Sequence, residues 1–156
     1  MKGRIAAGGG VLALAAGLIS YYEGYVPRGY ADPVGIPTAC YGHTGPEVRL
    51  GQLYTKAQCD ALLTQDIRIA QSQVKRCIRV PLKPHEEAAL VSFAFNVGGQ
   101  ALCGSTLAKR INAGQLPSAC AEMSKWIYSR GLKLPGLVKR RASERAMCEG
   151  ESRGLI

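Results

Sequence analysis

Two carboxylates and a hydroxyl that could act together occur close to one another in this chain, as Glu23, Asp32 and Thr38. Hydrolysis of a glycosidic bond needs a carboxylic acid that protonates the leaving oxygen, and a second group that activates or places a water. Glu23 suits the acid because it follows an apolar segment, which favours the protonated form of a carboxyl group. Asp32 lies in a turn-rich segment, where it would stay ionised and orient water, and Thr38 could hold that water. The spacing alone also fits Glu23 as a surface charge at a helix end.

The element that must position Glu23 is the apolar segment before it, Ile5 to Ser20. Lys2 and Arg4 precede this segment, and basic residues on that side predict export of the rest of the chain. Nine of the sixteen residues are Ala or Gly, which gain little from lipid, and the run is short for a span of about 20 residues. We therefore expect a weak membrane anchor.

Three interpretations of the segment are open. A cleaved signal peptide is compatible with the small residues of Ala13-Leu-Ala15. A permanent anchor fits the composition less well. A temporary anchor that can leave the bilayer explains both the weak apolarity and the closeness to Glu23, and we favour it.

The rest of the chain predicts a mainly helical domain with a small β-lobe, which is an α+β fold. Residues 25–51 are rich in Gly and Pro and predict short antiparallel strands. A capping box at Thr55-Lys-Ala-Gln58 opens a helix, and the apolar run 88–95, closed by Gly98-Gly99, predicts a buried central helix. Shorter helices are expected over about 105–113, 117–128 and 136–148.

The formal charge of +9 favours a polyanionic partner, which could be nucleic acid, an acidic lipid surface or an acidic polysaccharide. The charge could also serve solubility alone. Nucleic acid is not expected, because no binding motif occurs and the export segment opposes it.

Six cysteines form no CxxC pair, and Cys40-x-x-His43 has no second pair at zinc spacing, so no metal site is expected. An even count beside an export segment predicts disulfides in an oxidising compartment. Fifteen pairings are possible. Loop-closure economy favours the sequential one, which is Cys40–Cys59, Cys77–Cys103 and Cys120–Cys148.

The pattern Glu-x8-Asp-x5-Thr, present as Glu23, Asp32 and Thr38, resembles the catalytic motif of phage lysozyme-type endolysins. The weak apolar N-terminus resembles the signal-arrest-release members, whose anchor leaves the membrane and joins the soluble enzyme. Some of these are held inactive by a disulfide that a cysteine of the anchor opens, but this anchor has no cysteine. Further segments resemble the family in its order: 38–45, 92–98, 105–107, 126–128 and 136–144.

The resemblance implies roles for individual residues. Glu23 would be the general acid, Asp32 would position or activate water, and Thr38 would complete the site. Arg140 or Arg141 matches an arginine that pairs with the acid or supports its helix, although an exposed basic face with an Arg140–Glu144 contact is an alternative.

Three other residues have weaker assignments. His43 matches a family histidine and is expected to order the β-lobe. Asn96 could face the saccharide groove or make a buried hydrogen bond. Trp126 is expected in the core.

The resemblance thus implies a lysozyme-like muramidase that cleaves the β-1,4 bond between N-acetylmuramic acid and N-acetylglucosamine and lyses the host cell. Residues 1–22 would form the releasable anchor and residues 23–156 the catalytic domain. We expect a monomer without cofactor, first at the inner membrane and then in the periplasm. The alternatives are a lytic transglycosylase acting on the same bond and a non-catalytic membrane lysis protein.

Overall fold

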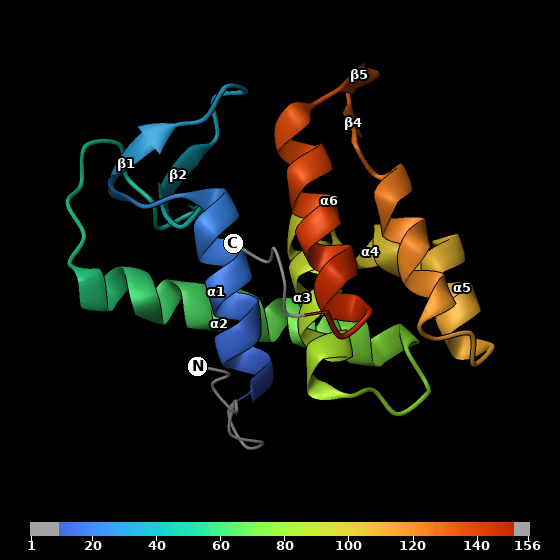
Figure 1. Ribbon diagram of the computed structural model, residues 1–156. Coiled ribbons are helices and arrows are strands. Elements are labelled where there is room, and N and C mark those ends of the chain that lie inside the picture. Colours follow the sequence, from blue (N-terminus) through green and yellow to red (C-terminus); the bar gives the residue numbers. More distant parts are fainter. Residues whose placement is uncertain (1–9, 152–156) are drawn as a thin grey trace.

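The computed structural model describes residues 10–151, which form a helical body with two small sheets (Figure 1). The helices are α1 (Gly10–Glu23), α2 (Lys56–Cys77), α3 (Pro84–Val97), α4 (Gly99–Cys103), α5 (Thr106–Asn112), the 3₁₀ helix η1 (Ser118–Lys125) and α6 (Pro135–Cys148). The strands are β1 (Val26–Ala31), β2 (Pro37–Cys40), β3 (His43–Thr44), β4 (Tyr128–Ser129) and β5 (Leu132–Lys133). The predicted α+β class is confirmed.

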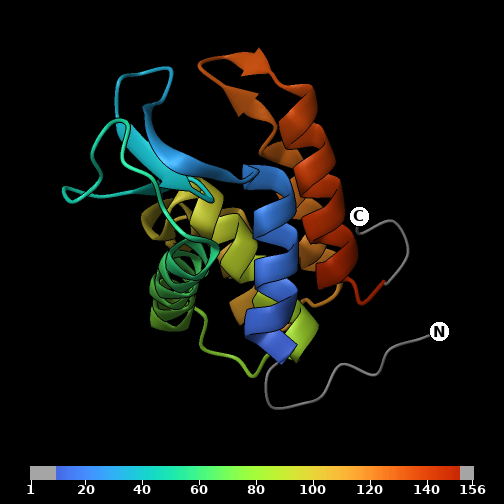
Figure 2. The same ribbon diagram turned by 90° about the vertical axis from the view of Figure 1, so that its left-hand side faces the viewer.

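Helix α3 is the centre of the body. Every residue from Ala88 to Ala94 is buried, as the run of apolar residues predicts. Helices α1, α2 and α6 all pack against it, and Figure 2 shows them around it. Pro84 begins the helix, and Gly98, with a φ of +94°, ends it.

The β-lobe follows α1 and consists of the antiparallel sheet β1-β2-β3. Tyr30 pairs with Thr38, and Thr38 pairs with Thr44 on its other side. The chain then enters α2 through the predicted capping box. In this box the Thr55 hydroxyl accepts from the Gln58 amide at 3.1 Å, and the Gln58 side chain accepts from the Thr55 amide at 2.8 Å.

Helix α1 contains the described part of the predicted anchor, while residues 5–9 of that segment lie outside the described residues. Its inner face buries Ala15, Leu18 and Ile19 in the common core. None of the helices within residues 10–151 is long and apolar enough to cross a membrane.

The C-terminal half departs from the predictions in two places. Residues 118–125 form a 3₁₀ helix where an α-helix over 117–128 was predicted, and the hairpin β4–β5 occupies residues 128–133, where no strand was predicted. The reason is tertiary, because Cys120 is bonded to α6 and Glu122 to Arg110 of α5 at 3.1 Å. Residue periodicity does not report such constraints.

Three disulfides join the elements, and their pairing is the sequential one: Cys40–Cys59, Cys77–Cys103 and Cys120–Cys148. The first ties the end of β2 to α2, the second ties the ends of α2 and α4, and the third ties η1 to the end of α6. Each closes a loop of moderate length, with sequence separations of 19, 26 and 28.

His43 on β3 is a second tie between the β-lobe and α2. Its Nδ1 lies 2.7 Å from Asp66 Oδ2, and its Nε2 lies 2.6 Å from Glu47 Oε1. Burial lowers the pKa of His43, but the hydrogen bonds to Glu47 and Asp66 outweigh burial and raise the pKa above 6.5. The same contact lowers the pKa of Glu47, whereas burial raises the pKa of Asp66. The predicted role of ordering the β-lobe fits these contacts.

We predict that replacing Cys120 and Cys148 together by Ala lowers the free energy of unfolding by about 3 kcal/mol, because the unfolded chain gains the entropy of an open loop. Chemical denaturation under non-reducing conditions measures the change. An unchanged midpoint and slope would contradict a stabilising role for this bond.

We also predict that the stability conferred by His43 depends on pH. Because its pKa is raised in the folded state, the contribution is complete below pH 6.5 and is lost as pH rises through the raised pKa. His43→Gln is expected to cost about 1–3 kcal/mol at low pH and less above neutrality. Urea unfolding of both proteins at about pH 5.5 and about pH 8.5 measures the difference. A difference that is equal at both pH values would disprove the linkage.

Candidate active site

The site is built around an ion pair between helix α1, near the start of the chain, and helix α6, near its end. Glu23 is the last residue of α1, and its Oε1 accepts from Arg140 Nη1 of α6 at 2.8 Å. The Arg140 side chain is 5% exposed and the Glu23 side chain 23% exposed. The carboxylate is therefore held on one side and open to solvent on the other.

A buried polar cluster on α6 and α3 supports this pair. Arg140 Nε donates to Glu144 Oε1 at 3.1 Å, and its Nη2 donates to the Ser92 carbonyl at 3.4 Å. The Ser92 hydroxyl also donates to Glu144 Oε1, at 2.8 Å, and Glu144 is fully buried. Arg141 Nη1 donates to Glu144 Oε2. Two arginines and two glutamates are thus paired, as burial of charge requires.

The loop between β2 and β3 reaches the acid at Gly42. A Cβ at this position would lie 2.7 Å from Glu23 Oε2, and the φ of Gly42 is +71°. The left-handed backbone favours glycine, and a side chain at this position would displace the Glu23 carboxylate. The β-lobe therefore contacts the Glu23 carboxylate through the backbone of Gly42, with no side chain between them.

Asp32 and Thr38 are held on one turn of the hairpin β1–β2. Asp32 Oδ1 accepts from the amides of Val34 at 2.9 Å and Ile36 at 2.8 Å. The Thr38 hydroxyl donates to the Ile36 carbonyl at 2.9 Å, and Thr38 is buried. Both side chains therefore bind the backbone of Ile36, Asp32 through its amide and Thr38 through its carbonyl.

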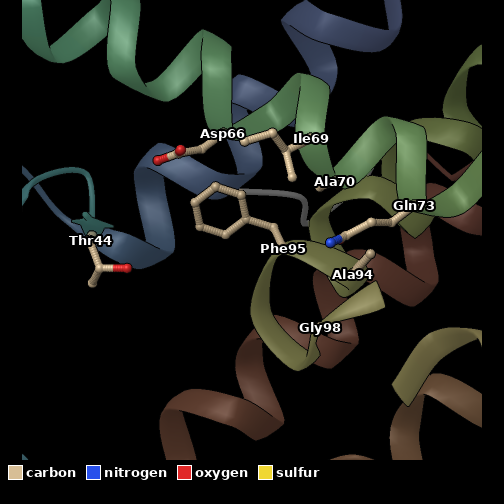
Figure 3. Close-up of a pocket in the computed structure, with 9 residues that line it drawn as sticks. Thr44, Asp66, Ile69, Ala70, Gln73, Ala94, Phe95 and Gly98 are labelled. Atoms are coloured by element: carbon tan, nitrogen blue, oxygen red, sulfur yellow. The ribbon is translucent and has the colours of Figure 1, made fainter. Parts of the chain in front are cut away.

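A cavity of about 250 Å³ lies beside Gly42, between the β-lobe, α2 and α3. Figure 3 shows the Phe95 ring, the Asp66 carboxylate and the Thr44 hydroxyl around this space. Polar side chains (Thr44, Asp66 and Gln73) and apolar ones (Ile69 and Phe95) line it together, which suits a sugar with a hydroxylated rim and apolar faces. Within residues 10–151, no cluster of His, Cys, Asp and Glu could hold a metal ion.

The other predicted residues support the site from outside. Arg141 does not contact Glu23; it donates to Asn96 Oδ1 and, through Nε, to the Trp126 carbonyl at 2.9 Å. The Trp126 ring packs edge-on against Phe93 in the core, as expected. The alternative of an exposed basic face at Arg140–Glu144 is wrong, because both side chains are buried.

Sequence reasoning missed three residues around the site, which are Gly42, Ser92 and Tyr22. The Tyr22 hydroxyl donates to the Lys139 carbonyl of α6 at 3.0 Å. A glycine inside a strand pattern signals a close backbone approach, and this signal was present at Gly42. Ser92 and Tyr22 carried no signal of their own, because their partners lie far away along the chain.

The chain is similar to characterised families over most of its length. The model of the family described as "Phage lysozyme" matches residues 20–144. The "SAR-endolysin" of Enterobacteria phage PA-2 is 39% identical over an aligned length of 151 residues, and the alignment covers 92% of this chain and 90% of that protein.

Two solved structures have the same fold. One is the muramidase domain of SpmX from Asticaccaulis excentricus, with a TM-score of 0.79, 33% identity, and coverage of 86% of this chain and 93% of that one. The other is the endolysin from Escherichia coli O157:H7 phage FAHEc1, with a TM-score of 0.78, 30% identity, and coverage of 95% and 96%. Because the family model spans the segment from the last turn of α1 through Glu144 of α6, and so contains both ends of the central ion pair, the chain belongs to the phage lysozyme family.

Proposed function

We propose that Glu23, Asp32 and Thr38 carry out the glycoside hydrolysis by which this lysozyme cleaves peptidoglycan. The substrate bond is the β-1,4 bond between N-acetylmuramic acid and N-acetylglucosamine, and its cleavage by an endolysin lyses the host cell. The observation that carries the assignment is the half-open Glu23 carboxylate, bound by Arg140 and lying against Gly42 beside the cavity.

Each residue has a defined task in this mechanism. Glu23 Oε1 is occupied by the guanidinium, so the proton that reaches the leaving oxygen is carried on Oε2. Asp32 Oδ1 is held by two amides, which leaves Oδ2 to orient a water and take its proton as the water attacks the sugar carbon. Thr38 fixes the turn that carries Asp32 and completes the water site. Arg140 is a supporting residue that binds Glu23 directly. Arg141 and His43 are also supporting residues, and they act through other side chains.

The N-terminal segment is proposed to keep the enzyme inactive until release. Residues 1–22 would be a temporary anchor in the inner membrane, and residues 23–156 the catalytic domain. While the segment lies in lipid, Glu23 is pinned at the bilayer surface and cannot meet Arg140 and Gly42. Release lets α1 pack on α3, and the monomeric enzyme then acts in the periplasm. The weak apolarity of residues 5–20 and the similarity to SAR-endolysins support this proposal.

We predict that Glu23→Gln lowers the rate of wall hydrolysis by about 10²–10⁴-fold, because Gln keeps the shape and removes the donated proton. Asp32→Asn is expected to lower the rate in the same way. Release of reducing ends from purified peptidoglycan measures the rate, and anhydro-sugars among the products would indicate transglycosylation instead. The exposed carboxylate Glu151 provides the control, since Glu151→Gln should retain full activity. Full activity in Glu23→Gln would refute the assigned acid.

The membrane switch predicts different activities in two fractions of the same wild-type preparation. Membrane-bound protein should be at least about tenfold less active per molecule than released protein, because the acid is misplaced by far more than the tolerance of about 0.5 Å. Wall-clearing assays on separated fractions, normalised by immunoblot, measure the ratio. Equal activity in both fractions would refute the switch and leave the assignment of Glu23 intact.

A further inference from the structure

Tyr22, the residue before the acid, binds the helix that carries the arginine. Its hydroxyl donates to the Lys139 carbonyl at 3.0 Å and is hydrogen-bonded to the Ser143 hydroxyl. A phenol has one hydrogen to donate, so Ser143 is the donor in the second bond. The Arg140 guanidinium carbon lies 5.8 Å from the centre of the Tyr22 ring.

These partners flank the catalytic ion pair on α6. Lys139 and Ser143 are one helical turn apart, and Arg140 lies between them in the chain. Tyr22 therefore binds the same turn of α6 that carries Arg140. The adjacent residues Tyr22 and Glu23 of α1 thus bind the adjacent residues Lys139 and Arg140 of α6. Figures 1 and 2 show the two helices side by side.

The remaining contacts of α1 do not fix its rotation equally well. Its buried residues are apolar, namely Ala15, Leu18 and Ile19, and apolar burial is non-directional. Hydrogen bonds have narrow ranges of distance and angle. The Tyr22 hydroxyl is thus the directional contact nearest to the acid, apart from the Glu23–Arg140 pair itself.

We propose that Tyr22 is a positioning residue: its hydroxyl locks the last turn of α1 to Lys139 and Ser143 of α6 and thereby holds Glu23 in its catalytic position. The inference rests on the proposed function, because it takes Glu23 as the general acid. It also adds a step to release. Tyrosine is enriched at membrane–water interfaces, so Tyr22 would lie at the interface while the segment is in the membrane. After α1 has refolded, the Tyr22 hydroxyl would bind α6 instead.

The neighbouring tyrosine offers a matched control. Tyr21 is 62% exposed, and its hydroxyl has no hydrogen bond among the described residues. The Tyr22 and Tyr21 rings pack edge-on with centres 5.0 Å apart, so the two phenols are direct neighbours although only Tyr22 is bonded to α6. Tyr22→Phe keeps the ring over Arg140 and removes only the hydroxyl, and Tyr21→Phe makes the same chemical change one residue earlier.

Steady-state kinetics on soluble peptidoglycan fragments tests the inference with released full-length protein, well below the melting temperature of every variant. We expect Tyr22→Phe to lower kcat about tenfold with KM changed less than about twofold, because a misplaced acid slows the chemical step and leaves substrate binding intact. Tyr21→Phe should match wild type. A variant of Tyr22 that is merely less stable would retain kcat at a temperature where it is folded.

Ser143→Ala removes one of the two hydrogen bonds of the Tyr22 hydroxyl and leaves the bond to the Lys139 carbonyl, and it keeps the test decisive if Tyr22→Phe folds poorly. It should lower kcat about threefold, and the double variant should be no slower than Tyr22→Phe alone, since both changes break one lock. Wild-type kcat in both Tyr22→Phe and Ser143→Ala would overturn the inference. In that case, an inactive Glu23→Gln variant would mean that only the positioning role of Tyr22 is refuted. An active Glu23→Gln variant would refute the assignment of Glu23 as the acid.

Discussion

A guanidinium buried between two carboxylates is the interaction on which the catalytic arrangement depends. Arg140 is bound by Glu144 from its own helix and by Glu23 from the opposite end of the chain. Without Glu23, the cluster would bury two arginines against the single carboxylate of Glu144. A buried charge without a partner is strongly unfavourable, so docking of the last turn of α1 is favoured electrostatically as well as by apolar packing. Docking of α1 therefore places Glu23 and completes the buried charge cluster together.

The other half of the site is organised separately, by the β-lobe. Asp32 and Thr38 are fixed within one hairpin, and the lobe is held to α2 by the Cys40–Cys59 disulfide and the His43–Asp66 contact. Gly42 brings this lobe against Glu23. The two halves meet at a carboxylate that belongs to neither α2 nor the sheet. Displacing α1 would therefore separate this carboxylate from both Arg140 and Gly42.

Under the proposed release, α1 serves in two surroundings. Its many Ala and Gly residues would make the segment a poor membrane span, whereas in the folded domain Ala15, Leu18 and Ile19 are buried in the core. The polar residues Tyr22 and Glu23, which bind α6 in the folded protein, lie at the C-terminal end of α1. In the proposed release, lipid holds the segment loosely, and the folded domain offers directional partners that lipid lacks.

Local patterns in the sequence predicted much of this protein. The capping box at Thr55, the apolar run of α3 and the Gly- and Pro-rich β-lobe are short-range features, and each appears in the structure as predicted. The spacing of Glu23, Asp32 and Thr38, together with the family resemblance, pointed to the three residues that we propose as catalytic. Loop-closure economy also gave the disulfide pairing, because neighbouring cysteines in the chain are neighbours in this fold.

Only the tertiary structure decided the environment of those residues. It decided between Arg140 and Arg141 as partner of the acid, since helical rotation points just one of them at α1. It showed that Arg140–Glu144 is buried, that residues 118–125 form a 3₁₀ helix, and that Tyr22 reaches α6. Each of these outcomes depends on contacts between segments that are distant along the chain. Periodicity and spacing describe a residue's own neighbours, and so they carry no information about which remote side chain will satisfy a buried charge or a hydroxyl.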